Sequence, residues 1–224
     1  MTYPVNETFL SWQGEGVHLG RKAFFIRLQG CPVRCAWCDA ASTWHPAYVP
    51  KDLRRASAEE LAAEAAASSP EFVVLTGGEP CIHDLNPLVA ALAAKGLATH
   101  LETCGAFGLP EGLAWVTVSP KWAKPPLPEV VSRADELKVI VEDPESIGKW
   151  ESSLGGWPCP VVWLHPEWTQ RANPAVLAAV TDAVKARGAP FRAGWQVHKP
   201  YAADLRDKGS RPAAPLGGDP AKGY

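Results

Sequence analysis

The sequence predicts an α/β fold in which parallel strands alternate with crossover helices. Short apolar or β-branched runs bounded by turn residues recur along the chain, as buried parallel strands do. Helix-like segments lie between several of these runs, and such alternation is typical of a parallel sheet that is either open or barrel-like. At 224 residues, 46% of them hydrophobic, the chain is long enough to bury a large core without a disulfide or metal.

The individual elements follow from local patterns. The expected strands are the apolar runs at residues 23–28, 72–75, 98–102, 115–118, 137–141, 161–164 and, less regular, 194–197. Three helices are expected: residues 57–68, which open with a capping box at Ser57 and Glu60; residues 85–94, closed by Gly96; and residues 174–187, which start with proline and stop before Gly188.

Composition sets the domain organisation and excludes two kinds of partner. From Tyr201 the chain loses periodicity, so residues 1–200 are expected to form one domain and residues 201–224 a flexible tail. The net charge of −2 argues against binding nucleic-acid phosphates. No run approaches the ~18 apolar residues of a membrane span, and the first residues do not resemble a secretion signal. We therefore expect a cytoplasmic protein with no membrane partner.

Four successive expected strands end in polar or glycine-rich loops. These loops are the cysteine-rich residues 30–39, the Thr-Gly-Gly-Glu-Pro segment at 76–80, the Glu-Thr-Cys-Gly segment at 102–105 and the Ser-Pro-Lys segment at 119–121. Because the chemistry of α/β folds collects at the carboxyl ends of the strands, we expect these loops to meet in one site.

The first loop carries Cys31, Cys35 and Cys38, which are close enough to surround one metal centre. Thiolates select iron–sulfur clusters, zinc or cuprous copper. A structural zinc site needs four ligands, usually as two pairs, and this loop has no second pair. Three ligands on a [4Fe–4S] cluster would leave one iron open to another molecule. The cysteine spacing therefore favours a cluster, with zinc and a distant fourth ligand such as His45 or Cys81 as the alternative.

This cysteine spacing resembles that of the radical S-adenosylmethionine (SAM) superfamily. The resemblance implies an incomplete (β/α) barrel of about six parallel strands, a [4Fe–4S] cluster and SAM bound to the open iron. It also implies that one electron from the cluster cleaves SAM to a 5′-deoxyadenosyl radical. Carried over by position, the SAM site comprises Trp37, Cys38, Asp39, Gly77, Gly78, Glu79, Glu102, Ser119, Pro120, Lys121 and His165. The two glycines would permit close approach to a ligand, and Glu79 would face the methionyl amine.

Other motifs narrow the family. Hydrogen-bond donors and acceptors that could bind the edge of a heterocycle are offered by Gln13, Glu15 and Arg27. Arg27 could also bind a carboxylate, because its guanidinium can bond both carboxylate oxygens. Together with residues 76–83, 115–121 and 196–199, this segment resembles the 7-carboxy-7-deazaguanine synthases. Carried over by position, the substrate-binding residues are Trp12, Gln13, Gly14, Glu15, Arg27 and Thr76.

The reaction implied by this resemblance converts 6-carboxy-5,6,7,8-tetrahydropterin to 7-carboxy-7-deazaguanine with loss of ammonia. The radical takes hydrogen from C6, the ring contracts, and the hydrogen returns so that SAM is regenerated. The resemblance also implies a homodimer and a reductant such as flavodoxin or ferredoxin.

The sequence departs from the family pattern at three places. Ala40 stands where the family has a threonine that binds Mg²⁺, so we expect weakened magnesium dependence, with water, Asp39 or Ser42 as substitutes. His165 stands where a Gln-Pro pair usually contacts SAM. The chain also continues beyond the point near the substrate where family members often end, so no contact from a terminal carboxylate is expected.

Three alternatives stay open at this point. A glycyl-radical-type activating enzyme would share the cysteine spacing, but it would not account for the Gln-Gly-Glu-Gly or Ser-Pro-Lys segments. A zinc-stabilised binding module would need a fourth ligand. An inactive family member is suggested by Ala40 alone. The remaining Cys81, Cys104 and Cys159 are interpreted as packing residues.

Overall fold

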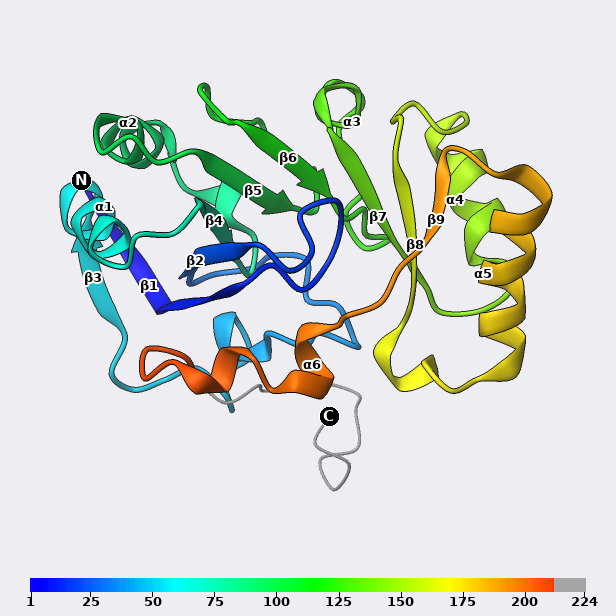
Figure 1. Cartoon of the computed structure of the whole chain (residues 1–224), viewed down its shortest axis with the longest axis horizontal. Helices are drawn as coiled ribbons and strands as arrows, with labels where there is room; N and C mark the ends of the chain where they lie inside the picture. Colours follow the sequence, from blue (N-terminus) through cyan, green and yellow to red (C-terminus); the bar gives the residue numbers. More distant parts are fainter. Residues whose placement is uncertain (212–224) are drawn as a thin grey trace.

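The computed structural model describes residues 1–211 and contains one curved, mostly parallel sheet (Figure 1). Within these residues nine strands form the sheet in the order β3-β1-β2-β4-β5-β6-β7-β8-β9. Strand β1 is antiparallel to both of its neighbours, and the other neighbouring pairs are parallel. The sheet does not close, which confirms the expected incomplete barrel.

Six strands confirm the sequence expectation: β2 (Lys22–Leu28), β4 (Phe72–Gly77), β5 (Thr99–Thr103), β6 (Trp115–Val118), β7 (Glu136–Val141) and β8 (Val162–Pro166). The seventh was misplaced, because β9 comprises Phe191–Ala193 and the chain leaves the sheet at Gly194. Two strands were not expected at all, β1 (Thr2–Trp12) and β3 (Arg54–Ser57).

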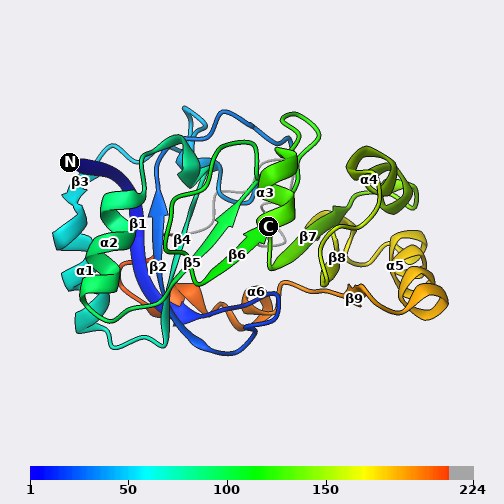
Figure 2. The same ribbon diagram turned by 90° about the horizontal axis from the view of Figure 1, so that it is seen from above.

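The helices of the described residues, except for the last and shortest, pack on the convex face of the sheet. They are α1 (Ala58–Ala67), α2 (Asn86–Ala94), α3 (Pro128–Arg133), α4 (Ser146–Leu154), α5 (Pro174–Arg187) and the short α6 (His198–Tyr201). The expected capping box is present, since Ser57 Oγ accepts from Glu60 N and Glu60 Oε2 accepts from Ser57 N. Figure 2 shows α1 and α2 at one end of the sheet and α4 and α5 at the other. None of the helices in the described residues has the length and apolar character needed to cross a membrane.

Strand alternation separates the core from the interior of the barrel. In β7, Leu137, Val139 and Val141 are fully buried in the core beneath α3, α4 and α5. Glu136 and Lys138 alternate with them and point to the concave side, as a period of two requires. A second core cluster fills the space between α1, α2 and the strands β2, β4 and β5. The concave side is therefore available for polar groups.

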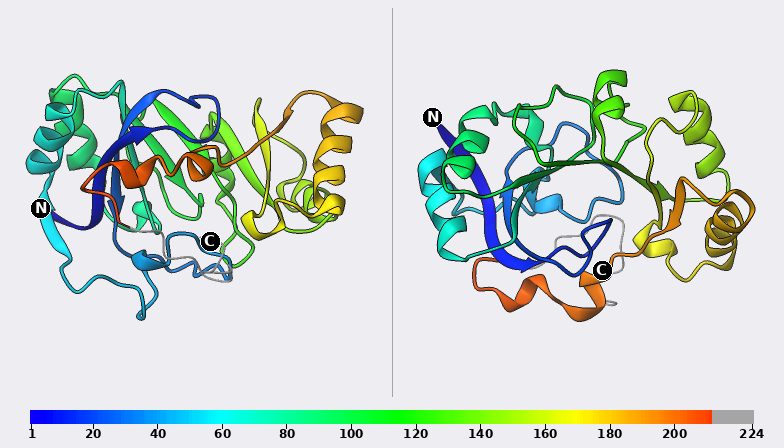
Figure 3. Two further views of the ribbon diagram at one scale, coloured as in Figure 1. Left: turned by 60° about the horizontal axis from the view of Figure 1, so that its bottom comes forward. Right: turned by 45° about the horizontal axis from the view of Figure 1, so that its top comes forward.

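Two segments lie on the concave side (Figure 3). The first is the connection between β1 and β2, residues 13–21, called here the hairpin loop. Its Val17 N donates to Glu136 Oε2 over 2.9 Å, and the ring of His18 packs on His100 and Trp115. The second, called the C-terminal strap, comprises residues 194–211.

The C-terminal strap runs along β1. Val197 N donates to Gly14 O over 3.1 Å, Ser11 Oγ to Asp204 Oδ1 over 2.9 Å and Leu10 N to Asp207 Oδ2 over 3.1 Å. The segment expected to be a flexible tail therefore begins with residues that bond to β1. The remainder of that expected tail, residues 212–224, lies outside the described residues.

Candidate active site

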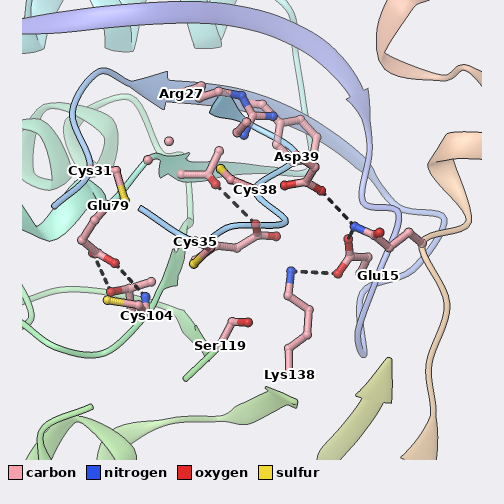
Figure 4. A pocket seen from close by; sticks show the side chains of 18 of the residues that line it. Glu15, Arg27, Cys31, Cys35, Cys38, Asp39, Glu79, Cys104, Ser119 and Lys138 are labelled. Atoms are coloured by element: carbon pink, nitrogen blue, oxygen red, sulfur yellow. Dashed lines mark hydrogen bonds and ion pairs between the residues drawn. The ribbon is translucent and has the colours of Figure 1, made fainter. Parts of the chain in front are cut away.

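The loops at the carboxyl ends of the strands surround a cavity of about 190 Å³ (Figure 4). Nearly all expected site residues line it: Trp12, Gln13, Gly14, Glu15, Arg27, Cys31, Cys35, Trp37, Cys38, Asp39, Ala40, Thr76, Gly77, Gly78, Glu79, Glu102, Ser119 and Lys121. Pro120 and His165 are the expected residues that do not. Residues far apart in the sequence thus meet in one place, as the positions of the loops after the strands predict.

Three thiols reach the cavity from the single loop that follows β2. Cys31, Cys35 and Cys38 are partly exposed and form no disulfide. Burial raises the pKa of Cys35, and it raises the pKa of Cys38 to about 11, so both thiols hold their protons near neutral pH until a metal displaces them. In residues 1–211 no three or more His, Cys, Asp or Glu side chains are grouped so as to hold a single metal ion, and this includes the three cysteines of the loop. A donor set of three thiols on one loop fits a cluster with one open iron.

Glycines allow the loop after β4 to pack directly on this cysteine loop. A Cβ atom at Gly78 would lie 2.4 Å from Gly30 O and 2.5 Å from Cys31 Cβ. The two loops are also hydrogen-bonded, because Glu79 N donates to Gly30 O over 2.9 Å. The close approach that Gly78 permits is therefore to the cysteine loop, whereas the sequence suggested approach to a ligand.

Glu79 is buried, and protein donors hold both of its carboxylate oxygens. Oε1 accepts from Thr103 Oγ1 over 2.7 Å and from Cys81 N over 3.0 Å, and Oε2 accepts from Cys104 N over 2.7 Å. This arrangement ties the loop after β4 to the end of β5. The carboxylate still borders the cavity, so a bound cation would meet its negative charge.

Glu15 and Lys138 form an ion pair on the inner wall of the cavity. Lys138 Nζ lies 2.8 Å from Glu15 Oε2, and their side chains are 16% and 9% exposed. Burial alone would raise the pKa of Glu15, but the positive charge of Lys138 lowers it well below its usual range. Burial would likewise lower the pKa of Lys138, and Glu15 raises it instead. Both groups are therefore charged at neutral pH.

Hydrogen bonds extend this pair into a network across the concave side. Gln196 Nε2 lies 2.9 Å from Glu15 Oε1 and 3.2 Å from Asp39 Oδ2, so one amide links the hairpin loop to the cysteine loop. Gln13 Nε2 donates to Glu102 Oε1 over 3.0 Å. Amide and carboxylate groups placed in this way can bind the donor and acceptor edge of a planar heterocycle.

Arg27 supplies a fixed positive charge. Its Nε lies 2.6 Å from Glu7 Oε1, and its side chain is 20% exposed, toward the cavity. Burial opposes the charged guanidinium, but Glu7 raises the pKa of Arg27 above its ordinary value. The guanidinium nitrogens not bound to Glu7 can bind a carboxylate.

The Ser-Pro-Lys segment after β6 is folded back on itself. Lys121 Nζ donates to Ser119 Oγ over 2.6 Å and to Ser119 O over 2.7 Å, and it lies 5.6 Å from the centre of the Trp37 ring. Burial lowers the pKa of Lys121. A side cavity of about 100 Å³ adjoins this group and is lined partly by Trp37, Ser119 and Lys121.

His165 lies behind the main cavity. It is 1% exposed and faces a small space of about 10 Å³ that Glu15 and Lys138 also line. Its Nδ1 is 3.9 Å from Glu15 Oε2, and burial lowers the pKa of His165 to about 4, so the imidazole is neutral. The structure thus places this residue against the Glu15–Lys138 pair.

The surroundings of Ala40 do not fit a magnesium ion. Ala40 has no side-chain oxygen, and Asp39 Oδ2 is already 3.3 Å from Lys199 Nζ as well as bonded to Gln196. Ser42, the other possible substitute, donates to Asn6 Oδ1 over 3.3 Å and does not line the cavity. Of the side-chain oxygens of Asp39 and Ser42, Asp39 Oδ1 alone has no hydrogen-bond partner within residues 1–211, which is few for a cation that prefers six oxygen ligands.

Sequence reasoning did not assign several residues that line the cavity. These are Phe25, Val33, Thr103, Cys104, Lys138, Gln196, His198 and Asp204. Lys138 could have been found, because it is a charged residue inside an apolar strand. Alternation along that strand puts its side chain on the face opposite the core. Gln196 and His198 lie in the 196–199 segment that carries part of the family resemblance, although no role was assigned to them. Asp204 had no such signal, since its place in the site depends on how the C-terminal strap runs along β1.

Comparison with known proteins agrees with this geometry. Residues 25–116 match the family described as the radical SAM superfamily. The chain is 40% identical over 201 residues to a 7-carboxy-7-deazaguanine synthase of Synechocystis, covering 89% of this chain and 92% of that protein. It is 33% identical to one of Flavobacterium psychrophilum over 88% and 90% of the two chains. The crystal structure of QueE from Escherichia coli superposes with a TM-score of 0.74 at 34% identity, over 88% of this chain and 95% of that one. The chain therefore belongs to the 7-carboxy-7-deazaguanine synthase family of radical SAM enzymes.

Proposed function

We propose that this chain converts 6-carboxy-5,6,7,8-tetrahydropterin to 7-carboxy-7-deazaguanine and ammonia. One observation carries the proposal: a single cavity brings the three thiols of the cysteine loop together with Arg27, Gln13 and Glu15. The identity to synthases over most of both chains supports it. When bound by Cys31, Cys35 and Cys38, a [4Fe–4S] cluster would, together with SAM, supply the radical chemistry that begins the reaction at C6 of the pterin.

The residues of this chain would bind the cluster and SAM. Cys31, Cys35 and Cys38 would hold the cluster, and the side cavity beside Trp37 and Lys121 is large enough to hold part of SAM. SAM contacts are proposed for Trp37, Cys38, Asp39, Gly77, Gly78, Glu79, Glu102, Ser119, Pro120 and Lys121. His165 is assigned a supporting position behind Glu15 in place of the SAM contact expected from the sequence.

The pterin is oriented by charge and by hydrogen bonds. Arg27 would bind the substrate carboxylate through its free guanidinium nitrogens. Glu15, held ionised by Lys138, would accept from N–H groups of the ring, and Gln13 would bind beside it. Trp12, Gly14 and Thr76 complete the wall. The hairpin loop and the C-terminal strap cover this part of the barrel and would exclude water from the radical chemistry.

The reaction is proposed to proceed without a magnesium ion. Ala40 lacks the hydroxyl of the family threonine, and Asp39 is engaged by Lys199 and Gln196. No step is therefore assigned to a divalent cation. The Lys199 ammonium, 3.3 Å from Asp39, provides a positive charge at this point of the site.

Three further proposals rest on the resemblance to the family. The reductant is a low-potential protein such as flavodoxin or ferredoxin, and the enzyme is a homodimer. The enzyme works in the cytoplasm, where a reducing environment keeps the cluster thiols available. Neither nucleic acid nor a membrane takes part.

The test is an anaerobic reconstitution with iron and sulfide, followed by incubation with SAM, dithionite and the pterin. The expected result is the mass of carboxydeazaguanine, formed without stoichiometric consumption of SAM. If the protein cleaves SAM but leaves the pterin unchanged, the proposed substrate is wrong. A colourless protein that retains zinc would overturn the radical mechanism as well. Cys38→Ala, which removes one ligand, is the negative control.

A further inference from the structure

We propose that Asp204, on the C-terminal strap, is a substrate-binding carboxylate that accepts a hydrogen bond from the reduced ring of the pterin. The inference rests on the proposed function. It assigns a role to a residue in the part of the chain that composition describes as a tail. Its basis is position, because the Asp204 side chain lines the main cavity together with Trp12, Arg27 and Ala40.

The fold fixes Asp204 from both sides. It begins a short 3-10 turn, Asp204–Arg206, and its Oδ1 accepts from Ser11 Oγ over 2.9 Å. Upstream, Lys199 and Gln196 attach the strap to Asp39. Downstream, Asp207 Oδ2 accepts from Leu10 N over 3.1 Å. The carboxylate is therefore held at the edge of the cavity.

Asp204 has one carboxylate oxygen that no protein donor reaches in residues 1–211, and no cation of the protein is paired with it there. Of the neighbouring carboxylates, Glu7 uses both oxygens, on Arg27 and Arg211 N. Asp39 is bonded at Oδ2 to Gln196 and paired there with the Lys199 ammonium, which compensates its charge and leaves Oδ1 open. Asp204 accepts one hydrogen bond, at Oδ1, and within residues 1–211 no protein donor reaches its Oδ2. Its negative charge acts on Arg27, since Asp204 is among the carboxylates that raise the pKa of that guanidinium.

These facts define the ligand group that Asp204 would bind. A carboxylate accepts hydrogen bonds and repels a second carboxylate, so it suits the ring N–H groups and not the acid group that Arg27 binds. A tetrahydropterin carries N–H groups at N5 and N8, and the fully oxidised ring has bare acceptor nitrogens there. Asp204 would thus favour the reduced ring over the oxidised one.

The test compares Asp204→Asn with Asp207→Asn in the full-length, cluster-loaded enzyme. Asparagine can still accept from Ser11, so the strap keeps its attachment while the charge is lost. Because a hydrogen bond to a charged group contributes about 1.5–3 kcal/mol, D204N should raise the KM for the tetrahydropterin by roughly 10- to 100-fold. Iron content and the KM for SAM should stay unchanged.

A second readout separates recognition from folding. The dissociation constants of 6-carboxytetrahydropterin and its oxidised form, pterin-6-carboxylate, are measured for wild type and both variants. Wild type and D207N should prefer the reduced ligand, and D204N should lose most of that preference. Wild-type affinities in D204N, or an equal rise in KM in D207N, would overturn the role of Asp204. Wild-type enzyme that does not convert the pterin overturns the proposed function itself, so that measurement comes first.

Discussion

Lys138 Nζ lies 2.8 Å from Glu15 Oε2, and this ion pair joins β7 to the hairpin loop inside the curved sheet. The two side chains are nearly buried, so removing either partner leaves an uncompensated charge away from water. This relationship gives the first prediction.

Lys138→Met should lower the free energy of unfolding by about 3–5 kcal/mol, the usual cost of breaking a buried pair. The double variant K138M/E15Q removes both charges and should lose clearly less than the sum of the single changes. Urea denaturation of the four proteins, under anaerobic conditions, gives the coupling energy. Strict additivity would show that the pair does not interact.

Acid should destabilise the fold through two buried histidines. Burial lowers the pKa of His165 to about 4 and that of His100 to about 3, from an ordinary 6.5. The unfolded chain binds these protons below pH 6.5 and the folded chain does not. The stabilising contribution of these two neutral histidines is therefore complete above pH 6.5. As the pH drops toward 4, the free energy of unfolding falls by about 1.4 kcal/mol per pH unit for each histidine.

His165→Gln tests this titration separately. Its unfolding free energy, measured with urea from pH 7 to pH 4, should fall less steeply than that of wild type. The difference in slope should correspond to about one proton fewer taken up on unfolding. His45→Gln is the matched control, because His45 is only half-buried and its ring neighbours are Trp44 and Tyr48. Equal slopes for H165Q and wild type would contradict the prediction.

Close packing at Gly78 should be required for the cluster. Gly78→Ala places a Cβ 2.4 Å from Gly30 O and 2.5 Å from Cys31 Cβ, so the cysteine loop must shift. We expect the iron content after reconstitution to fall severalfold. Gly148→Ala is the control, since nothing lies within 4 Å of its Cβ and alanine in a helix gains up to about 1 kcal/mol. Full iron loading in G78A would show that the loop accommodates the methyl group.

The six cysteines should divide into two groups. Alanine at Cys31, Cys35 or Cys38 should abolish iron binding and SAM cleavage. Cys159→Ala should keep the iron and lose about 1–3 kcal/mol of stability, because Cys159 is buried in the core beside Ala134. Iron analysis and visible absorption separate the groups. Loss of iron on replacing Cys81 or Cys104 would instead identify a fourth thiolate ligand.

Magnesium should have little influence on turnover. With Ala40 in place of a hydroxyl ligand, a chelator should change kcat/KM by less than about twofold. Ala40→Thr restores the oxygen and should make turnover respond to added Mg²⁺. If the chelator instead caused a large loss of kcat/KM in the wild-type enzyme, and Mg²⁺ alone reversed it, then water or Asp39 would complete a magnesium site.

The parallel strands and the site loops were predictable because both follow local rules. Apolar runs such as 72–75 have the composition of strands buried on both faces, and functional loops follow their carboxyl ends. Strand β1 escaped prediction because Pro4 and the polar residues Asn6 and Glu7 interrupt its pattern, and because its pairing has an irregularity between Val5 and Glu7. Pairing with β2 and β3 compensates for this weak local signal.

The unpredicted part of the site depends on contacts between distant segments. Residues 194–197 have the apolar character of a strand, yet Gln196 bonds to Glu15 and Asp39 and draws the segment out of the sheet. Asp204 enters the cavity for the same reason. Local pattern cannot reveal such positions, since they are set by hydrogen bonds to residues more than 150 positions away in sequence.

An incomplete barrel has two edge strands where a closed one has none, and exposed edges can pair with other chains and seed aggregation. Here the edges are β3, four residues long, and β9, three residues long. Both carry exposed arginines, Arg54 and Arg55 on β3 and Arg192 on β9. Their short length and like charge oppose edge-to-edge growth between molecules. The opening that admits a substrate therefore need not make the protein prone to form fibrils.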